Sequence, residues 1–192
     1  MCGIIGAASS RSVGKILIKG LQLMEYRGYD SAGVVLNKEE EILRLRSLGK
    51  VSKLEEIMIS EKPKAFSGIA HTRWATHGAP SEENAHPHGS HDDIYIVHNG
   101  IIENHEEIRV FLKSEGYKIT SETDSELIAH LVHFYKKVTQ DTLQALMKAT
   151  HELSGAYSIA AVCKKEKGKV YAARQKSPLL VGLGIEENFV AS

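Results

Sequence analysis

Strands and helices are expected in separate blocks along this sequence, and that order sharply narrows the choice of folds. Apolar runs of strand length are concentrated before residue 100 and after residue 155, and three consecutive helical patterns lie between these two blocks. A parallel α/β sheet requires strands and helices to alternate regularly, which this order does not do. We therefore predict an α+β fold in which sheets pack together beneath layers of helices.

The predicted elements follow from apolar periodicity and from turn-forming residues. One long connection, residues 73–93, carries two prolines and four histidines. A connection of that length inside a compact domain is usually functional. We expect strands at 2–8, 32–36, 42–48, 66–72, 94–97, 156–163, 170–173, 179–182 and 189–191, and helices at 13–24, 53–59, 103–115, 126–135 and 143–153.

Length and composition exclude several classes of protein. With no linker and no low-complexity segment, residues 1–192 are expected to form one domain with a sizeable core, since 42% of the residues are hydrophobic. Lys and Arg number 24, as do Asp and Glu, so no net charge favours nucleic acid or an anionic membrane as a partner. No apolar run reaches the roughly 18 residues that span a bilayer, and the first residues lack the basic region of a signal peptide. We expect a cytoplasmic protein.

Cys2 is the first candidate for a catalytic residue. A small second residue permits removal of Met1, which would leave a thiol and a free α-amine on one residue. Reference pKa values of about 8.5 for a thiol and about 7.7–8.0 for an α-amine allow the amine to act as a base near neutral pH. Cys2 would then be nucleophile and base together, as in enzymes with an N-terminal threonine. The alternative is a small buried residue at the start of a strand.

Four further residues supply the groups that such a nucleophile needs. Asn99 and Gly100 offer a side-chain amide and an accessible backbone N–H for an oxyanion, although an Asn-Gly pair also favours a hairpin turn. The planar guanidinium of Arg73 suits a substrate carboxylate, or else a surface ion pair. Asp124 begins a helical pattern, where its carboxylate suits a substrate ammonium or simply caps the helix. Together these groups suit hydrolysis of the side-chain amide of an amino acid.

Six short motifs, in this order, strongly resemble those of one family. They are similar to the glutaminase domain of glutamine–fructose-6-phosphate aminotransferase, also called glucosamine-6-phosphate synthase, a class II (N-terminal nucleophile) glutamine amidotransferase. The resemblance runs from Cys2 to the end of the chain. The motifs are CGIIG at 2–6, EYRGYDSAG at 25–33, HTRWATHG at 71–78, NAHPH at 84–88, HNGIIEN at 98–104 and SETDSE at 121–126.

The resemblance implies a role for each matching residue. Cys2, freed of Met1, would attack the side-chain amide of L-glutamine, giving a γ-glutamyl thioester and ammonia, and L-glutamate would follow. Asn99 and the Gly100 N–H would form the oxyanion hole. Arg73 would bind the glutamine carboxylate and Asp124 its α-ammonium. The remaining implied residues are Thr76 and His77, which would contribute to binding, Trp74, which would close over glutamine and take part in gating ammonia, and Arg27, which would support the nucleophile.

The resemblance also implies an architecture and partners. The family fold is a four-layer αββα sandwich of the N-terminal nucleophile hydrolase type, in agreement with the blocks of strands and helices. The implied partner is the isomerase domain of the same full-length enzyme, which would be a homodimer that converts fructose-6-phosphate to glucosamine-6-phosphate with the ammonia. The sugar-phosphate isomerase domains are expected to be absent from this chain, which alone would only hydrolyse glutamine. No cofactor and no metal are implied.

Three alternatives stay open. Five histidines lie within residues 71–91 and imidazole is a common zinc ligand, but neither a His-Glu-x-x-His motif nor a set of cysteines accompanies them, so they would instead pack the loop or face solvent. The domain could belong to a phosphoribosylamine-forming or asparagine-forming class II amidotransferase, although the motifs at 74–77 and 84–88 favour the hexosamine branch. It could also be a glutamine-sensing module without activity, although the complete set of residues argues against that.

Overall fold

The computed structural model describes residues 2–38, 41–75 and 78–192. In that part of the chain it contains ten strands, five α-helices and one short 3₁₀ helix, Glu25–Arg27. The strands and α-helices, in chain order, are β1 (Gly3–Ser9), α1 (Gly14–Met24), β2 (Ser31–Asn37), β3 (Ile42–Leu48), α2 (Val51–Glu61), β4 (Ser67–Arg73), β5 (His88–Ser90), β6 (Ile94–Ile102), α3 (His105–Ser114), α4 (Asp124–Thr139), α5 (Thr142–Glu152), β7 (Gly155–Cys163), β8 (Tyr171–Gln175), β9 (Leu180–Leu183) and β10 (Glu187–Ala191).

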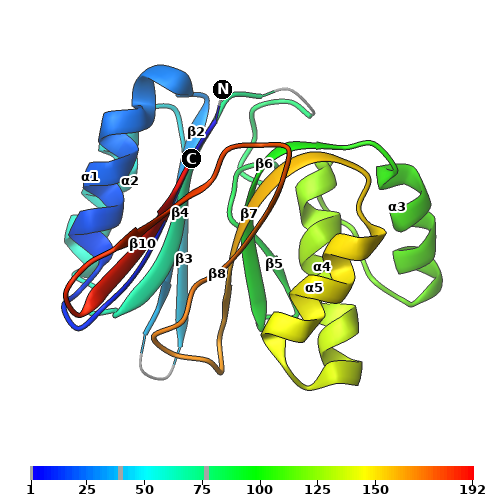
Figure 1. The fold of residues 1–192 in the computed structure, drawn as a ribbon. Helices are drawn as coiled ribbons and strands as arrows, with labels where there is room; N and C mark the ends of the chain where they lie inside the picture. Colours follow the sequence, from blue (N-terminus) through cyan, green and yellow to red (C-terminus); the bar gives the residue numbers. More distant parts are fainter. Residues whose placement is uncertain (1, 39–40, 76–77) are drawn as a thin grey trace.

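Two antiparallel sheets pack face to face and carry helices on both outer faces (Figure 1). The first sheet has the strand order β3-β2-β4-β1-β10-β9 and is covered by α1 and α2. The second has the order β5-β6-β7-β8 and is covered by α4 and α5, with α3 against α4. The predicted four-layer αββα order is confirmed. No helix in the described part of the chain is long and apolar enough to cross a bilayer.

Side chains alternate along the central strands and fill three apolar layers. In β1, Ile5 packs with the residues of α1, whereas its neighbour Ile4 packs between the two sheets. In β7, Ile159 packs with the helices of the second sheet, whereas Ala160 packs between the sheets. Successive side chains of a strand point to opposite faces, so a strand that is buried on both faces appears in the sequence as a continuous apolar run.

The predicted element boundaries are correct to within four residues except in one region. The strand expected to end at Val97 continues to Ile102 as β6, because β7 pairs with it along its whole length. Asn99 and Gly100 therefore lie inside a strand, and the alternative of a hairpin turn at this pair is wrong. The connection 73–93 also contains a short strand, β5, which pairs with β6. The extension of β6 beyond Val97 and the short strand β5 do not stand out in the sequence as apolar runs. Pairing with a neighbouring strand determines that each of them is extended.

Candidate active site

Cys2 precedes β1 and lies where the ends of β1, β4 and β6 come together. β1 and β4 are neighbours in the first sheet, with Gly3 opposite Thr72, and β6 belongs to the facing sheet. A pocket opens at this point. Its lining includes six of the residues predicted from the sequence, namely Cys2, Arg73, Trp74, Asn99, Gly100 and Asp124.

The Cys2 sulfur contacts the backbone of Trp74. The Trp74 N–H donates to Cys2 Sγ at 3.1 Å, and the thiol lies 3.5 Å from the Trp74 carbonyl oxygen. Trp74 is 43% exposed, and its indole ring packs edge-on against the ring of Tyr29, with 5.5 Å between ring centroids. Trp74 therefore holds the sulfur through its backbone, while its side chain lies at the rim of the pocket.

Asn99 and Gly100 are adjacent in β6 of the second sheet and line the same pocket as Cys2. The Asn99 amide Nδ2 donates to the Cys2 carbonyl oxygen at 3.1 Å and to Ser192 Oγ at 2.9 Å. Gly100 has φ +134°, and a Cβ at this position would lie 2.1 Å from the carbonyl oxygen of Ala156. Only glycine fits this close approach of β6 to β7.

Arg73 is the last residue of β4 and is only 4% exposed, so the alternative of a surface ion pair is wrong. Its guanidinium donates to the carbonyl oxygens of Gly78 at 3.2 Å and Ala79 at 3.4 Å. Burial lowers the pKa of the Arg73 guanidinium from its usual value. Thr76 and His77, the two predicted binding residues in the same loop, lie outside the described residues.

Asp124 is the first residue of α4, but Thr123 caps the helix. The Thr123 hydroxyl accepts from the N–H of Glu126 at 3.4 Å, as an N-cap residue does. Asp124 Oδ2 instead accepts from the N–H of Ile102 at 2.9 Å, and its Oδ1 lies 3.7 Å from His98 Nδ1. The Asp124 carboxylate thus connects the start of α4 to β6 at the edge of the pocket.

Arg27 does not line the pocket, but it is connected to the pocket residue Asn99 through Ser192. Its guanidinium donates to the backbone oxygen of Ser192 at 2.7 Å. The Ser192 hydroxyl in turn accepts from the N–H of Ile4 at 3.0 Å and from Asn99 Nδ2. Arg27 therefore reaches the surroundings of Cys2 through Ser192, which sequence reasoning did not identify.

Four buried histidines line and support the pocket, and we call them the site-side histidines. They are His71, His86, His88 and His98. Burial lowers the pKa of His71 and of His88 to about 3, and it lowers those of the other two as well. Uncharged imidazoles are therefore expected here at physiological pH. Among the residues that the structure describes, no group of three or more His, Cys, Asp or Glu side chains is placed to hold a metal ion.

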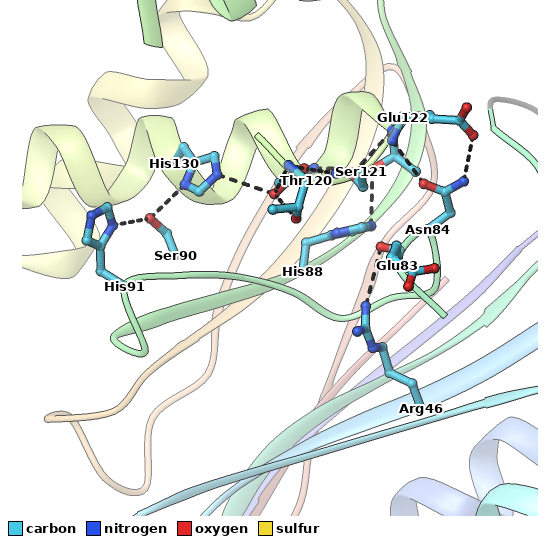
Figure 2. Close-up of polar contacts among 12 residues, drawn as sticks. Arg46, Glu83, Asn84, His88, Ser90, His91, Thr120, Ser121, Glu122 and His130 are labelled. Carbon is cyan, nitrogen blue, oxygen red and sulfur yellow. Dashed lines mark hydrogen bonds and ion pairs between the residues drawn. The ribbon is translucent and has the colours of Figure 1, made fainter. Parts of the chain in front are cut away.

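A pair of hydrogen bonds joins Asn84 to Glu122, two residues before Asp124 in the chain (Figure 2). Asn84 Nδ2 donates to Glu122 Oε2 at 2.9 Å, and the Glu122 N–H donates to Asn84 Oδ1 at 2.9 Å. The same Glu122 oxygen accepts from the N–H of Ala79 at 3.2 Å. This Asn84–Glu122 clasp ties the end of the loop that begins at Arg73 to the segment that precedes Asp124.

Sequence reasoning also missed residues that hold the predicted ones in place. Asp30 accepts from the Ala75 N–H at 2.8 Å, and its own N–H donates to the Arg73 carbonyl oxygen at 3.0 Å. His71 and His98 contact Asn99 and Ser125, respectively. Asp30, His71 and His98 lie inside the recognised motifs, and that position was a signal of their importance. Their contacts cross between distant segments, so spacing along the chain could not assign them partners.

Comparisons with known proteins agree with the motifs. A family profile described as a glutamine amidotransferase domain matches residues 71–192. The whole chain is 56% identical to part of a glutamine–fructose-6-phosphate aminotransferase (isomerizing) of Haemophilus influenzae and 54% identical to part of one of Pseudomonas putida. The chain spans only 32% of the length of each of these relatives.

The fold is also found in a solved structure of lower sequence identity. A glutamine phosphoribosylpyrophosphate amidotransferase from B. subtilis superimposes with a TM-score of 0.84 at 22% identity. The match covers 99% of this chain and 41% of that protein. At this identity the likeness establishes the fold alone.

Proposed function

The chain belongs to the glutamine amidotransferase domain family, and on that premise we propose that it hydrolyses L-glutamine to L-glutamate and ammonia with Cys2 as the nucleophile. The observation that carries this proposal is the pocket in which a thiol, a cation, an anion and an amide donor meet. Arg73 and Asp124 supply opposite charges for the two ends of an α-amino acid, and Cys2 and Asn99 supply the reactive groups. The family match begins at residue 71, so the role of Cys2 rests on the pocket and on the N-terminal motif.

The proposed first half-reaction begins once Met1 has been removed. The Cys2 α-amine takes the thiol proton, and Sγ attacks the side-chain amide carbon of glutamine. Negative charge develops on the amide oxygen, where Asn99 Nδ2 and the Gly100 N–H are available as donors. Asn99 Nδ2 donates to the neutral Cys2 carbonyl oxygen in the present structure, and a charged oxyanion is the stronger acceptor. The C–N bond then breaks, and the proton leaves with the nitrogen as ammonia.

The second half-reaction regenerates Cys2. Water attacks the γ-glutamyl thioester, the same donors hold the second oxyanion, and the C–S bond breaks. The α-amine passes the proton of water back to sulfur, and L-glutamate leaves. Throughout, Arg73 holds the α-carboxylate and Asp124 the α-ammonium, with Thr76 and His77 contributing to binding. Trp74 covers the pocket, and Arg27 supports Cys2 through Ser192.

In a longer protein we propose that the ammonia is not released to solvent. The two named relatives are about three times as long as this chain, and their name describes transfer of nitrogen from glutamine to fructose-6-phosphate. An isomerase domain of the same polypeptide would receive the ammonia and form glucosamine-6-phosphate. The homodimer and the cytoplasmic location expected from the sequence stay predictions.

The test is the release of ammonia and glutamate from glutamine by the purified chain, with intact mass showing whether Met1 has been removed. Cys2→Ala is expected to abolish release without changing the far-ultraviolet circular dichroism spectrum. Cys2→Ala that releases ammonia at the parent rate would refute the nucleophile. A metal-dependent alternative predicts that a chelator abolishes activity while an alkylating glutamine analogue leaves it intact, and we expect the opposite result for both reagents.

A further inference from the structure

We propose that His71 is a positioning residue that determines which way the Asn99 side-chain amide faces, and that it thereby contributes to the rate of glutamine hydrolysis. The inference rests on the proposed function, because it deepens the role of Asn99 as an oxyanion donor. Neither the motifs nor the comparisons assign a function to His71. The argument starts from the hydrogen bonds of Asn99.

An asparagine amide has two ends of nearly equal size, one that donates and one that accepts. If the Asn99 amide were turned over, its oxygen would face the developing negative charge and would destabilise it. The Nδ2 end lies 3.1 Å from the Cys2 carbonyl oxygen, an atom that can only accept. Oδ1 therefore faces the opposite side, where a donor would stabilise this orientation of the amide.

His71 supplies that donor. Its Nε2 lies 2.8 Å from Asn99 Oδ1, which can only accept, so Nε2 must carry the hydrogen of the neutral ring. His71 is only 1% exposed, and burial holds the pKa of the imidazole at about 3, so the ring stays neutral in the physiological range. The bond therefore brings no second charge into the pocket.

The His71 ring is itself held in place. It stacks on His86, with 4.0 Å between ring centroids and 16° between ring planes. His86 Nδ1 accepts from the backbone N–H of His98 at 3.2 Å, and His98 immediately precedes Asn99 in β6. His71 comes from β4 of the first sheet, so the contact fixes an amide of one sheet from the facing sheet. This arrangement maintains the amide orientation before substrate binds, which is what an oxyanion donor requires.

A double-mutant cycle tests the inference. In the purified chain freed of Met1, Asn99→Ala is expected to lower kcat by about 10²–10³. His71→Phe keeps a flat ring but removes the donor, and it is expected to lower kcat by about 10- to 100-fold with KM for glutamine changed less than about twofold. Because His71 acts through Asn99, the double variant should lose no more than about threefold beyond Asn99→Ala alone.

Two conservative variants add a rescue. His71→Gln can place an amide N–H near the position of Nε2 and is expected to retain most of kcat, whereas His71→Asn is too short to reach Asn99 and should resemble His71→Phe. Alkylation of Cys2 by iodoacetamide requires the thiol but no amide donor, so its rate should be the same in all these variants if the pocket is folded. Where His71→Phe fails to fold, the pair His71→Gln and His71→Asn decides the matter.

The outcomes separate this inference from the proposed function. If Asn99→Ala retains the parent kcat, the oxyanion role of Asn99 in the proposed function is wrong. If Asn99→Ala loses activity but the loss in the double variant is the product of the two single losses, His71 does not act through Asn99 and only this inference is overturned. Equal kcat values for His71→Gln and His71→Asn would overturn it as well.

Discussion

Two groups of histidines differ in the parts of the molecule that their hydrogen bonds hold in place. The site-side histidines surround the pocket and contact groups proposed to act on glutamine, such as Asn99 and Asp124. A second group, which we call the distal histidines, consists of His91, His130 and His133. There His91 stacks on His133 at 4.2 Å, and Ser90 Oγ lies 3.1 Å from His91 Nδ1 and 2.9 Å from His130 Nδ1 (Figure 2).

The difference shows that histidines close together in the sequence separate into two groups in the described part of the chain. His71 in β4 and His86, two residues before β5, line the pocket, and His88 in β5 contacts the pocket residue Thr123. His91 follows β5 and stacks instead on His133 of α4. Both groups use their imidazoles in hydrogen bonds, and burial lowers the pKa of the four site-side histidines and of His133. The site-side group orients side chains around Cys2, whereas the distal group attaches α4 to the β5–β6 turn.

The largest expected effect is the response of the site-side histidines to acid. A histidine of the unfolded chain titrates near pH 6.5, while the folded-state pKa of His88 is about 3, so the unfolded state binds more protons as pH falls. His88 therefore contributes stability that is complete above pH 6.5 and is lost between pH 6.5 and about 3. The expected slope is up to about 1.4 kcal/mol per pH unit.

Urea unfolding of the parent and of His88→Gln at pH 6 and pH 5 measures this slope before carboxyl groups titrate strongly. The free energy of unfolding should depend less steeply on pH in the variant than in the parent, by up to about 1.4 kcal/mol per pH unit. His133→Gln in the distal group should do the same only down to about pH 4, where the folded His133 itself titrates. Parallel pH dependences for the parent and His88→Gln would show that His88 becomes charged in the folded protein.

The next effect separates stability from activity in the distal group. Ser90→Ala removes the hydroxyl at His130 Nδ1, and both residues are buried, so we expect about 1–3 kcal/mol of destabilisation. Ser90 pairs with Ile94 in β6, and Asn99 lies five residues further along that strand, about 16 Å at 3.3 Å per residue. The kcat for glutamine should therefore stay within about twofold of the parent value.

Urea unfolding and ammonia release from the same preparations check this prediction. Ser60→Ala is the matched control, because the Ser60 hydroxyl is exposed and donates only to the Ile57 carbonyl oxygen. That control should change the free energy of unfolding by less than about 0.5 kcal/mol. A large fall in kcat for Ser90→Ala would mean that the two histidine groups act as one unit.

The smallest effect is expected at the Asn84–Glu122 clasp, and it should appear in binding. Glu122→Ala removes the acceptor of the Asn84 and Ala79 N–H groups, which frees the end of the loop that begins at Arg73. Glu122 is exposed, so stability should change little. We expect KM for glutamine to rise about tenfold, or about 1.4 kcal/mol, with kcat nearly unchanged.

Steady-state kinetics with glutamine test the clasp, and Glu122→Gln is the control because its amide oxygen can still accept a hydrogen bond. That variant should have a KM within about twofold of the parent value. An unchanged KM in Glu122→Ala would show that the clasp has no part in the glutamine loop. A fall in kcat alone would place Glu122 in the chemical step instead.

The sequence by itself was sufficient for the layered fold and for most of the proposed chemistry. Apolar runs report burial on both faces of a strand, so strands such as β1 and β7 were predicted nearly to their ends. Cys2, Arg73 and Asp124 were found because their residue types suit a nucleophile and the two ends of an amino acid, and the ordered motifs supplied the family. These properties are local, and a chain displays them residue by residue.

Only the tertiary structure decided how the candidates meet and what holds them. Asn99 and Gly100 lie in a strand because β7 pairs with β6, and the close approach to Ala156 is a contact between residues 56 positions apart. The partner of His71 is in the facing sheet, and that of Asn84 is 38 residues away in the chain. Hydrogen bonds between distant segments have no periodicity along the sequence. They form only when packing of the apolar layers brings those segments together.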